Sequence, residues 1–360
     1  MEPKKQPPDL ALGLRWPHRL LQLFPVSWKR NYLLRKSGGE AGQESFDLCA
    51  QLRKSKRFLI VWPERSEELL VAFPAIRVLR ETTGGDSVYA HLVPAELTPL
   101  IADLFPGEQI LSWMREELAW HEPSIQATLG ALIAFSPEMT VNLMRPCPTV
   151  VKALVKASGA ALRMAVDGEN ARPYANMLVQ SEADSPLATH YFQILNSWRY
   201  ADFVVKEQWP VLQPDPEQRH DAAEAWALSG AAPENTWLYI HDAFNASRPL
   251  NDELHAWLQE RIQAQDAGEP SIAVVVFNPP DAHPIFREGV WLKTPVLKAS
   301  SLSEFLSIAG LARGVAAFQG AGLHIASLTD VGCLAFLRRE ESAYDASTLN
   351  KLFTVDWIDV

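Results

Sequence analysis

The hydrophobic positions of this chain alternate between two spacings from about residue 57 to residue 337. Short apolar runs are typical of buried parallel strands, and between them apolar residues recur at the i, i+3, i+4 spacing of helices. Strands are expected at 57–62, 88–93, 110–113, 139–144, 162–166, 236–240, 271–277 and 314–318, with another ending at Leu337. Helices are expected at 67–80, 122–134, 149–158, 190–200, 221–228 and 252–265, and from Leu302, where Ser301 or Ser303 is a candidate N-cap. This alternation predicts an α/β fold with parallel sheets covered on both faces.

The elements fall into two series, separated by a segment rich in proline and polar residues at 207–220. We therefore expect two facing Rossmann-like domains with a cleft between them. The expected boundaries are an arm and linker at 1–45, a first domain at 46–215, a second domain at 216–340 and a tail at 341–360. The pattern leaves open whether the tail lies back across the first domain.

A glycine-containing turn follows the strand expected at 314–318. Gly320, Ala321 and Gly322 carry almost no side chain, so the backbone can turn sharply and a ligand can approach it closely. A helix opening at His324 would then present free N–H groups at the carboxyl end of a strand, where open α/β sheets bind phosphates. A simpler interpretation remains open, in which the glycines only allow close packing and His324 is a buried packing residue.

Composition and charge exclude several classes of protein. The 360 residues carry a formal net charge of −10, which argues against general nucleic-acid binding. The three cysteines form no CxxC pair, so we expect neither a disulfide framework nor a zinc site. Without a signal-peptide core or a membrane-spanning run, the chain is predicted to be cytoplasmic.

The charge is distributed unevenly along the chain. Residues 1–36 carry eight basic and two acidic residues, a net charge of +6, which leaves −16 for the remainder. Basic residues mixed with tryptophan and leucine suit an anionic membrane surface and predict a peripheral membrane arm. The alternative is an arm that packs on the body of the protein or on a partner subunit. The residues assigned to this arm are Arg15, Trp16, Arg19, Trp28, Lys29 and Arg30.

Two stretches carry a resemblance to a known family. The run SLSEFLSIAGLARGVAAFQGAGLHIASLTDVGCLAFL, from Ser301 to Leu337, resembles the C-terminal signature of bacterial lipopolysaccharide heptosyltransferases, glycosyltransferase family 9. The family's histidine falls on His324, and its following Leu-Ala falls on Ile325 and Ala326. The run FLIVWPERSEELLVAFPAIRVLRE is similar to the N-terminal motif, with the family's proline at Pro74. The resemblance spans about 57–340 and implies two Rossmann-like domains of the GT-B type.

The resemblance also implies a reaction and the residues that perform it. The family transfers heptose from ADP-heptose to the lipopolysaccharide core with inversion and without a metal or other cofactor. A carboxylate takes the proton of the acceptor hydroxyl, and helix N–H groups with a cation stabilise the leaving diphosphate. Glu68 stands at the place of the catalytic Asp. The residues that fall on the donor site are Arg248, Gln319, Gly320, Ala321, Gly322, Leu323 and His324.

The chain departs from the family pattern at several site positions. The departures are Glu67 for a glycine, Glu68 for the catalytic Asp, Gln319 for an Asp, Gly320 for Ser or Thr, Arg248 for a Lys, and the turns at 241–244 and 278–280, which lack glycine. Two hypotheses follow. One is a membrane-surface glycosyltransferase with a nucleotide-sugar donor and a glycolipid acceptor. The other is a non-catalytic descendant that binds a protein partner or assembles at the membrane.

The pair His241-Asp242 is a further candidate for a functional site. His241-Asp242 follows a predicted strand and could be an acid/base or metal-ligating pair. Because no other ligand stands at a suitable spacing, a loop pair is the simpler interpretation.

Overall fold

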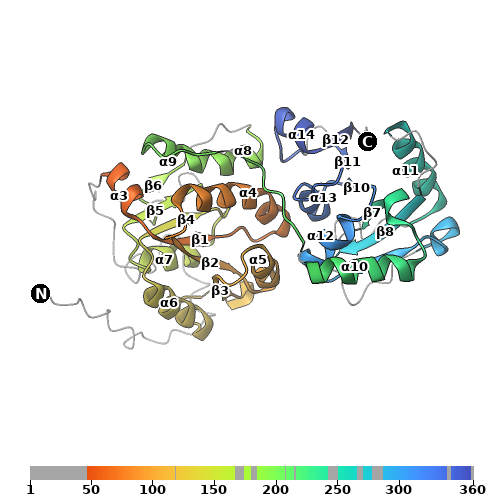
Figure 1. The fold of residues 1–360 in the computed structure, drawn as a ribbon. Coiled ribbons are helices and arrows are strands. Elements are labelled where there is room, and N and C mark those ends of the chain that lie inside the picture. Colours follow the sequence, from red (N-terminus) through yellow and green to blue (C-terminus); the bar gives the residue numbers. More distant parts are fainter. Residues whose placement is uncertain are drawn as a thin grey trace, which may run out of the picture. The chain divides into compact units, whose positions relative to one another are not determined.

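The computed structural model describes residues 47–117, 119–166, 174–179, 185–206, 208–214, 216–241, 250–265, 271–277, 287–338 and 342–357 (Figure 1). The chain divides into two compact units, which are described separately. The first unit comprises the described residues up to 62, together with 87–96 and 109–179. The second unit comprises 63–86, 97–108 and the described residues from 185 onward.

The first unit is built on one parallel sheet. Its strands are β1 (Arg57–Val61), β2 (Val88–Pro94), β3 (Gln109–Trp113), β4 (Met139–Asn142), β5 (Leu162–Ala165) and β6 (Met177–Leu178). Its helices are α3 (Leu48–Lys54), η2 (Arg115–Glu117), α6 (Pro123–Phe135) and α7 (Thr149–Ala157), with η1 (Ala95–Leu97) at the boundary of the unit. The strand order is β3-β2-β1-β4-β5-β6, and every neighbouring pair is parallel. This is the doubly wound order of a Rossmann sheet.

Apolar side chains from the sheet and from two helices form the core of the first unit. Leu59 and Leu92 of the central strands pack with Ile125 of α6 and Leu154 of α7, all of them fully buried. The apolar runs of the strands are buried on both faces, as a parallel sheet requires.

The second unit has the same sheet topology as the first and contains more helices. Its strands are β7 (Thr236–His241), β8 (Ser271–Phe277), β9 (Val296–Ala299), β10 (Gly314–Phe318), β11 (Cys333–Leu337) and β12 (Thr354–Trp357). Its helices are α4 (Ser66–Thr83), α5 (Thr98–Leu104), α8 (Leu187–Phe192), η4 (Gln193–Leu195), α9 (Asn196–Tyr200), α10 (Pro216–Ser229), η5 (Pro233–Asn235), α11 (Asp252–Gln265), η6 (Gly289–Leu292), α12 (Leu302–Ala309), α13 (Ala321–Ala326) and α14 (Ala346–Leu352). The order β12-β11-β10-β7-β8-β9 is parallel throughout.

The core of the second unit is rich in aromatic rings. Tyr239 and Phe318, from neighbouring strands, meet edge to face with their centroids 6.2 Å apart. Trp257 of α11 stacks on Phe318 at 5.6 Å, and Trp291 of η6 is fully buried against the same cluster. These contacts hold α11 and η6 on the sheet beside β7 and β10.

The predicted α/β fold with two Rossmann-like sheets is confirmed, and every predicted strand is found. Ser301 is the N-cap of α12, since its side chain accepts from the Glu304 N–H at 3.1 Å. The helix predicted at 221–228 begins earlier, at Pro216. The helix predicted at 190–200 is three short pieces, α8, η4 and α9. The last described residues form α14 and β12, and β12 pairs with β11 of the second sheet.

The described residues contain no candidate for a membrane-spanning helix. None of the helices there combines the length and the apolar character needed to cross a bilayer.

Candidate functional site

The second sheet has its topological switch point between β7 and β10. The chain leaves β7 toward β8 on one side and leaves β10 toward β11 on the other. In open α/β sheets, ligands bind outside the carboxyl ends of the two strands that flank such a point. Here those ends are His241 on β7 and the segment Gln319-Gly320 that follows β10.

The turn after β10 depends on a glycine. Gly320 has φ 152° and ψ −175°, a region of backbone conformation that is essentially restricted to glycine. The sharp change of direction is therefore complete at this residue, and α13 begins at Ala321. The prediction that the helix begins at His324 is wrong by three residues. Ala321 and Gly322 can both adopt helical conformation, so they form its first turn.

The donor-site residues on this turn differ in their exposure. Gln319 and Ala321 are partly exposed, whereas Gly320, Gly322 and Leu323 are buried. Of these five residues only Gln319 and Ala321 are therefore reached by solvent, and the Oε1 atom of Gln319 is itself buried. Gln319 can hydrogen-bond hydroxyl groups but adds no charge.

His324 is turned into the protein interior. Its side chain is 4% exposed, and its Nδ1 lies 2.6 Å from the hydroxyl of Tyr344, so that either group can donate the hydrogen bond. Burial lowers the pKa of His324 to about 3 and raises the pKa of Tyr344. The imidazole is therefore neutral at physiological pH and contributes no positive charge to the turn.

His241 lies at the end of β7 rather than in a loop. It pairs in register with Val276 of β8, and its side chain is 4% exposed. Its Nδ1 has no hydrogen-bond partner in the part of the chain that the structure describes, and burial lowers its pKa. Sequence reasoning treated His241 as a loop residue, since only the strand order reveals that it stands at the switch point.

Two carboxylates open helix α4. Glu67 and Glu68 lie in its first turn, and Arg65 at the N-cap position stands beside both of them. The Arg65 Nε lies 3.7 Å from Glu67 Oε2, and its Nη1 lies 3.9 Å from Glu68 Oε1. The guanidinium thus stands between the two acidic side chains at the start of the helix. Because the Arg65 side chain is 66% exposed, these pairs contribute little to stability.

Helices α4 and α13 contact each other within the second unit. The helix that carries Glu68 thus meets the helix that follows the glycine turn, although their sequences lie far apart. Nearby, α5 is joined to α12, where the N–H of Leu302 donates to Asp103 Oδ2 at 2.8 Å. Two predicted parts of a transfer site, a carboxylate helix and a phosphate-binding turn, are therefore on adjoining elements.

The remaining predicted residues lie outside the described part of the chain. Arg248 falls in 242–249, and the six residues assigned to the membrane arm fall in 1–46. Over the described residues, no group of three or more His, Cys, Asp or Glu side chains is arranged to hold a metal ion.

The fold is shared with solved glycosyltransferases. A glycosyl transferase family 9 protein from Veillonella parvula superposes with a TM-score of 0.63 over 88% of this chain and 89% of its own, at 12% identity. The Escherichia coli ADP-heptose lipopolysaccharide heptosyltransferase II gives 0.57 over 83% and 90%, also at 12% identity. The Escherichia coli heptosyltransferase WaaC, solved with ADP, gives 0.55 over 84% and 93%, at 15% identity.

This chain has the fold of the family 9 glycosyltransferases. No protein-family profile and no curated protein sequence matches it. At 12–15% identity this likeness shows the fold alone, and the function of the site is argued from the residues present.

Proposed function

We propose that this protein is an inverting, metal-independent glycosyltransferase that takes its sugar from a nucleotide diphosphate donor such as ADP-heptose. The observation that carries this proposal is the contact between α4, with Glu68 in its first turn, and α13, which follows the Gly320 turn. The structure of WaaC with ADP supports an ADP-linked donor. The proposed acceptor is a glycolipid hydroxyl at the inner membrane surface.

Glu68 is the proposed general base. An inverting transfer requires the acceptor hydroxyl to lose its proton as its oxygen attacks the anomeric carbon, and a carboxylate can take that proton. The Arg65 Nη1 lies 3.9 Å from Glu68 Oε1, beside the carboxylate that would take the proton. Glutamate reaches one methylene further than aspartate, so the acceptor would stand correspondingly further from the α4 backbone.

Helix α13 is proposed to stabilise the leaving diphosphate. The backbone N–H groups at the start of α13 and the Arg248 side chain are the proposed stabilising groups. Arginine in place of lysine keeps the positive charge and offers two parallel hydrogen bonds to phosphate oxygens. Gln319 is proposed to bind a hydroxyl group of the donor.

Replacement of the base tests this assignment. Glu68→Gln should lower the rate of sugar transfer by about 10²- to 10⁴-fold, because the amide cannot accept the proton. Donor affinity should stay within about twofold. The measurements are release of ADP from an ADP-linked sugar in the presence of a lipopolysaccharide-core acceptor, and calorimetric binding of ADP. Glu67→Gln is the matched control and should keep most of the activity. A parallel loss of binding and turnover would mean that Glu68 acts structurally.

A second candidate function is a non-catalytic binding or assembly subunit of the same fold. The observation that favours it is the burial of His324, which leaves this residue neutral and turned toward Tyr344 instead of toward a phosphate. A thermal-shift screen separates the two candidates. A working donor site at 100 times Kd should gain about 2.7 kcal/mol from ADP or an ADP-linked sugar. Absence of a shift with every nucleotide tried would favour the non-catalytic function.

A further inference from the structure

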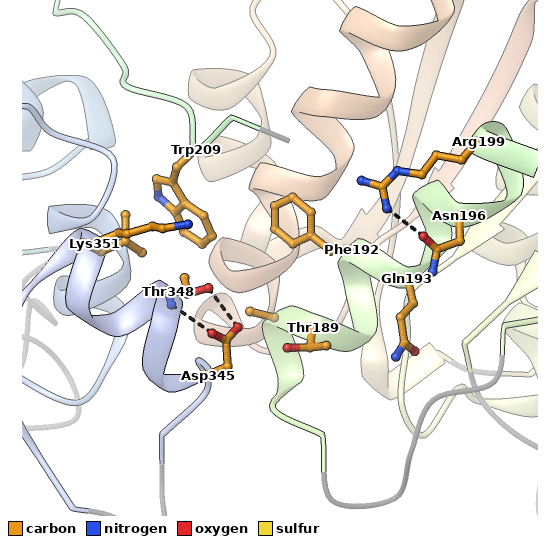
Figure 2. A pocket seen from close by; sticks show the side chains of 11 residues that line it. Thr189, Phe192, Gln193, Asn196, Arg199, Trp209, Asp345, Thr348 and Lys351 are labelled. Atoms are coloured by element: carbon orange, nitrogen blue, oxygen red, sulfur yellow. Dashed lines mark hydrogen bonds between the residues drawn. The ribbon is translucent and has the colours of Figure 1, made fainter. Parts of the chain in front are cut away.

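A cavity of about 330 Å³ lies in the second unit, away from the turn after β10 (Figure 2). Its walls come from α8, η4 and α9, from Trp209, and from α14 with the residue that precedes it. Its volume falls at the lower end of the range of about 300–1,000 Å³ for small-molecule pockets. None of the roles proposed above for Glu68 or the α13 turn uses it.

One wall of the cavity is an ordered aromatic surface. Phe192 of α8 and Trp209 stack with their ring centroids 6.0 Å apart and an interplanar angle of 25°. The indole Nε1 donates to the Ser327 carbonyl at 3.0 Å, and the edge of Tyr344 packs against the same indole. Trp209 is therefore held in place before any ligand arrives.

Two cationic side chains stand at the rim. Figure 2 shows Lys351 of α14 beside Trp209, and Arg199 of α9 on the other side of Phe192. Arg199 Nη1 donates to Asn196 Oδ1 at 2.8 Å, which orients the guanidinium. The Lys351 ammonium makes no hydrogen bond or ion pair with any residue that the structure describes.

The one carboxylate of the cavity is already engaged. Asp345 caps α14, accepting from the Thr348 N–H and from the Thr348 hydroxyl, both at 2.9 Å. Burial works to raise the pKa of Asp345, but the hydrogen bonds from Thr348 and Ser347 outweigh it and lower the pKa. The carboxylate is thus committed to the helix, and the described residues that line the cavity carry two basic side chains and one acidic side chain.

We propose that this cavity binds an acidic saccharide, a sugar that carries a carboxylate or phosphate group. The aromatic pair offers a surface for the apolar C–H face of a sugar ring. Hydroxyl and amide groups of Thr189, Gln193 and Asn196 offer hydrogen bonds to sugar hydroxyls. Lys351 and Arg199 pair with the acid group through charge-assisted hydrogen bonds.

Calorimetric titration of the full chain tests this site. The probes are glucuronic acid and glucose 1-phosphate, with glucose and inorganic phosphate as the neutral and sugar-free comparisons. All titrations include saturating ADP, so that a donor site, if it works, is already filled. Both acidic sugars should bind, glucose at least tenfold more weakly, and phosphate at least tenfold more weakly than glucose 1-phosphate.

Single variants locate the binding. Lys351→Gln and Arg199→Gln should each weaken binding of the acidic sugars about tenfold. Lys293→Gln, an exposed lysine after η6, is the matched control and should leave binding unchanged. Because Lys351 and Arg199 are both exposed, their replacement should leave the thermal midpoint unchanged, which confirms that each variant is folded.

Three results would overturn the proposal. They are no binding of either acidic sugar at millimolar concentration, equal binding of inorganic phosphate, and equal binding by Lys351→Gln and Lys293→Gln. Each of these outcomes is independent of whether ADP binds, so failure of the glycosyltransferase proposal would leave this test intact.

Discussion

At the scale of single residues, His324 packs in the interior at a position where the sequence resemblance to family 9 implies a ligand contact. Its backbone belongs to the helix that follows the Gly320 turn, yet its imidazole is buried against Tyr344. Tyr344 in turn packs against Trp209, which donates to the end of α13. The histidine therefore joins α13 to the C-terminal segment through its contact with Tyr344.

Burial of this imidazole predicts a pH dependence of stability. The unfolded chain binds a proton on His324 below its ordinary pKa of about 6.5, whereas the folded chain does not until about pH 3. The unfolded state is thus favoured as pH falls through this window. Between pH 6.5 and 5.0, His324 should remove about 2 kcal/mol from the free energy of unfolding.

Urea unfolding at several pH values measures this effect. His255 and His241 also have pKa values lowered by burial, so the informative quantity is the difference in pH slope between wild type and His324→Gln. His220→Gln, at an exposed position on α10, should keep the wild-type slope. An identical slope in His324→Gln and wild type would show that the histidine takes up its proton in the folded state.

At the scale of elements, strand β10 can approach β7 closely because Gly314 has no side chain. A Cβ on Gly314 would lie 2.8 Å from the Trp237 ring, closer than real Cβ atoms come to their neighbours. Gly314→Ala should lower stability by about 1–3 kcal/mol, since the ring is part of a packed core. Gly332→Ala is the control, since Gly332 directly precedes β11 and a Cβ there would meet no atom within 4 Å. Equal denaturation midpoints for the two variants would contradict this reason for the glycine.

Hydrophobic spacing predicted the central strands and the edge strand β3, and missed the edge strands β6, β9 and β12. Runs such as 57–61 and 271–277 are continuous because both faces of a central parallel strand are covered. β9 and β12 are short edge strands with partly exposed residues, so they carry no comparable run. The sequence pattern places Pro216 in the segment between the two series, whereas in the structure it is the first residue of α10, a position that proline favours.

The candidate site could be predicted in part. The glycine turn and the carboxylates of α4 were visible as motifs, and the structure places both at helix starts. The contact between α4 and α13 and the position of His241 depend on strand order, which no local spacing encodes. The cavity at Trp209 gave no sequence signal, because its walls come from segments more than one hundred residues apart.

At the scale of the whole molecule, charge is divided along the chain. The remainder after residue 36 carries −16 and would be repelled by an anionic surface, so any attraction must come from the basic arm. Each lysine or arginine close to such a surface contributes about 1 kcal/mol.

The arm can be tested by removing it. A chain without residues 1–36 should no longer sediment with anionic liposomes, while the full chain should do so at low salt and less at high salt. Neutral phosphatidylcholine liposomes are the control and should retain neither protein. Sedimentation of the shortened chain at the level of the full one would place membrane binding elsewhere or exclude it.

Because the second unit is discontinuous in sequence, cutting the chain at one point does not separate the two units. The polypeptide passes between the units five times, at residues 62–63, 86–87, 96–97, 108–109 and 179–180. A fragment that starts near residue 180 would lack α4 and α5, the helices that cover α13 and α12. Such a half would expose the apolar surface that α4 and α5 cover in the whole chain, so a cut near residue 180 does not separate two self-sufficient units.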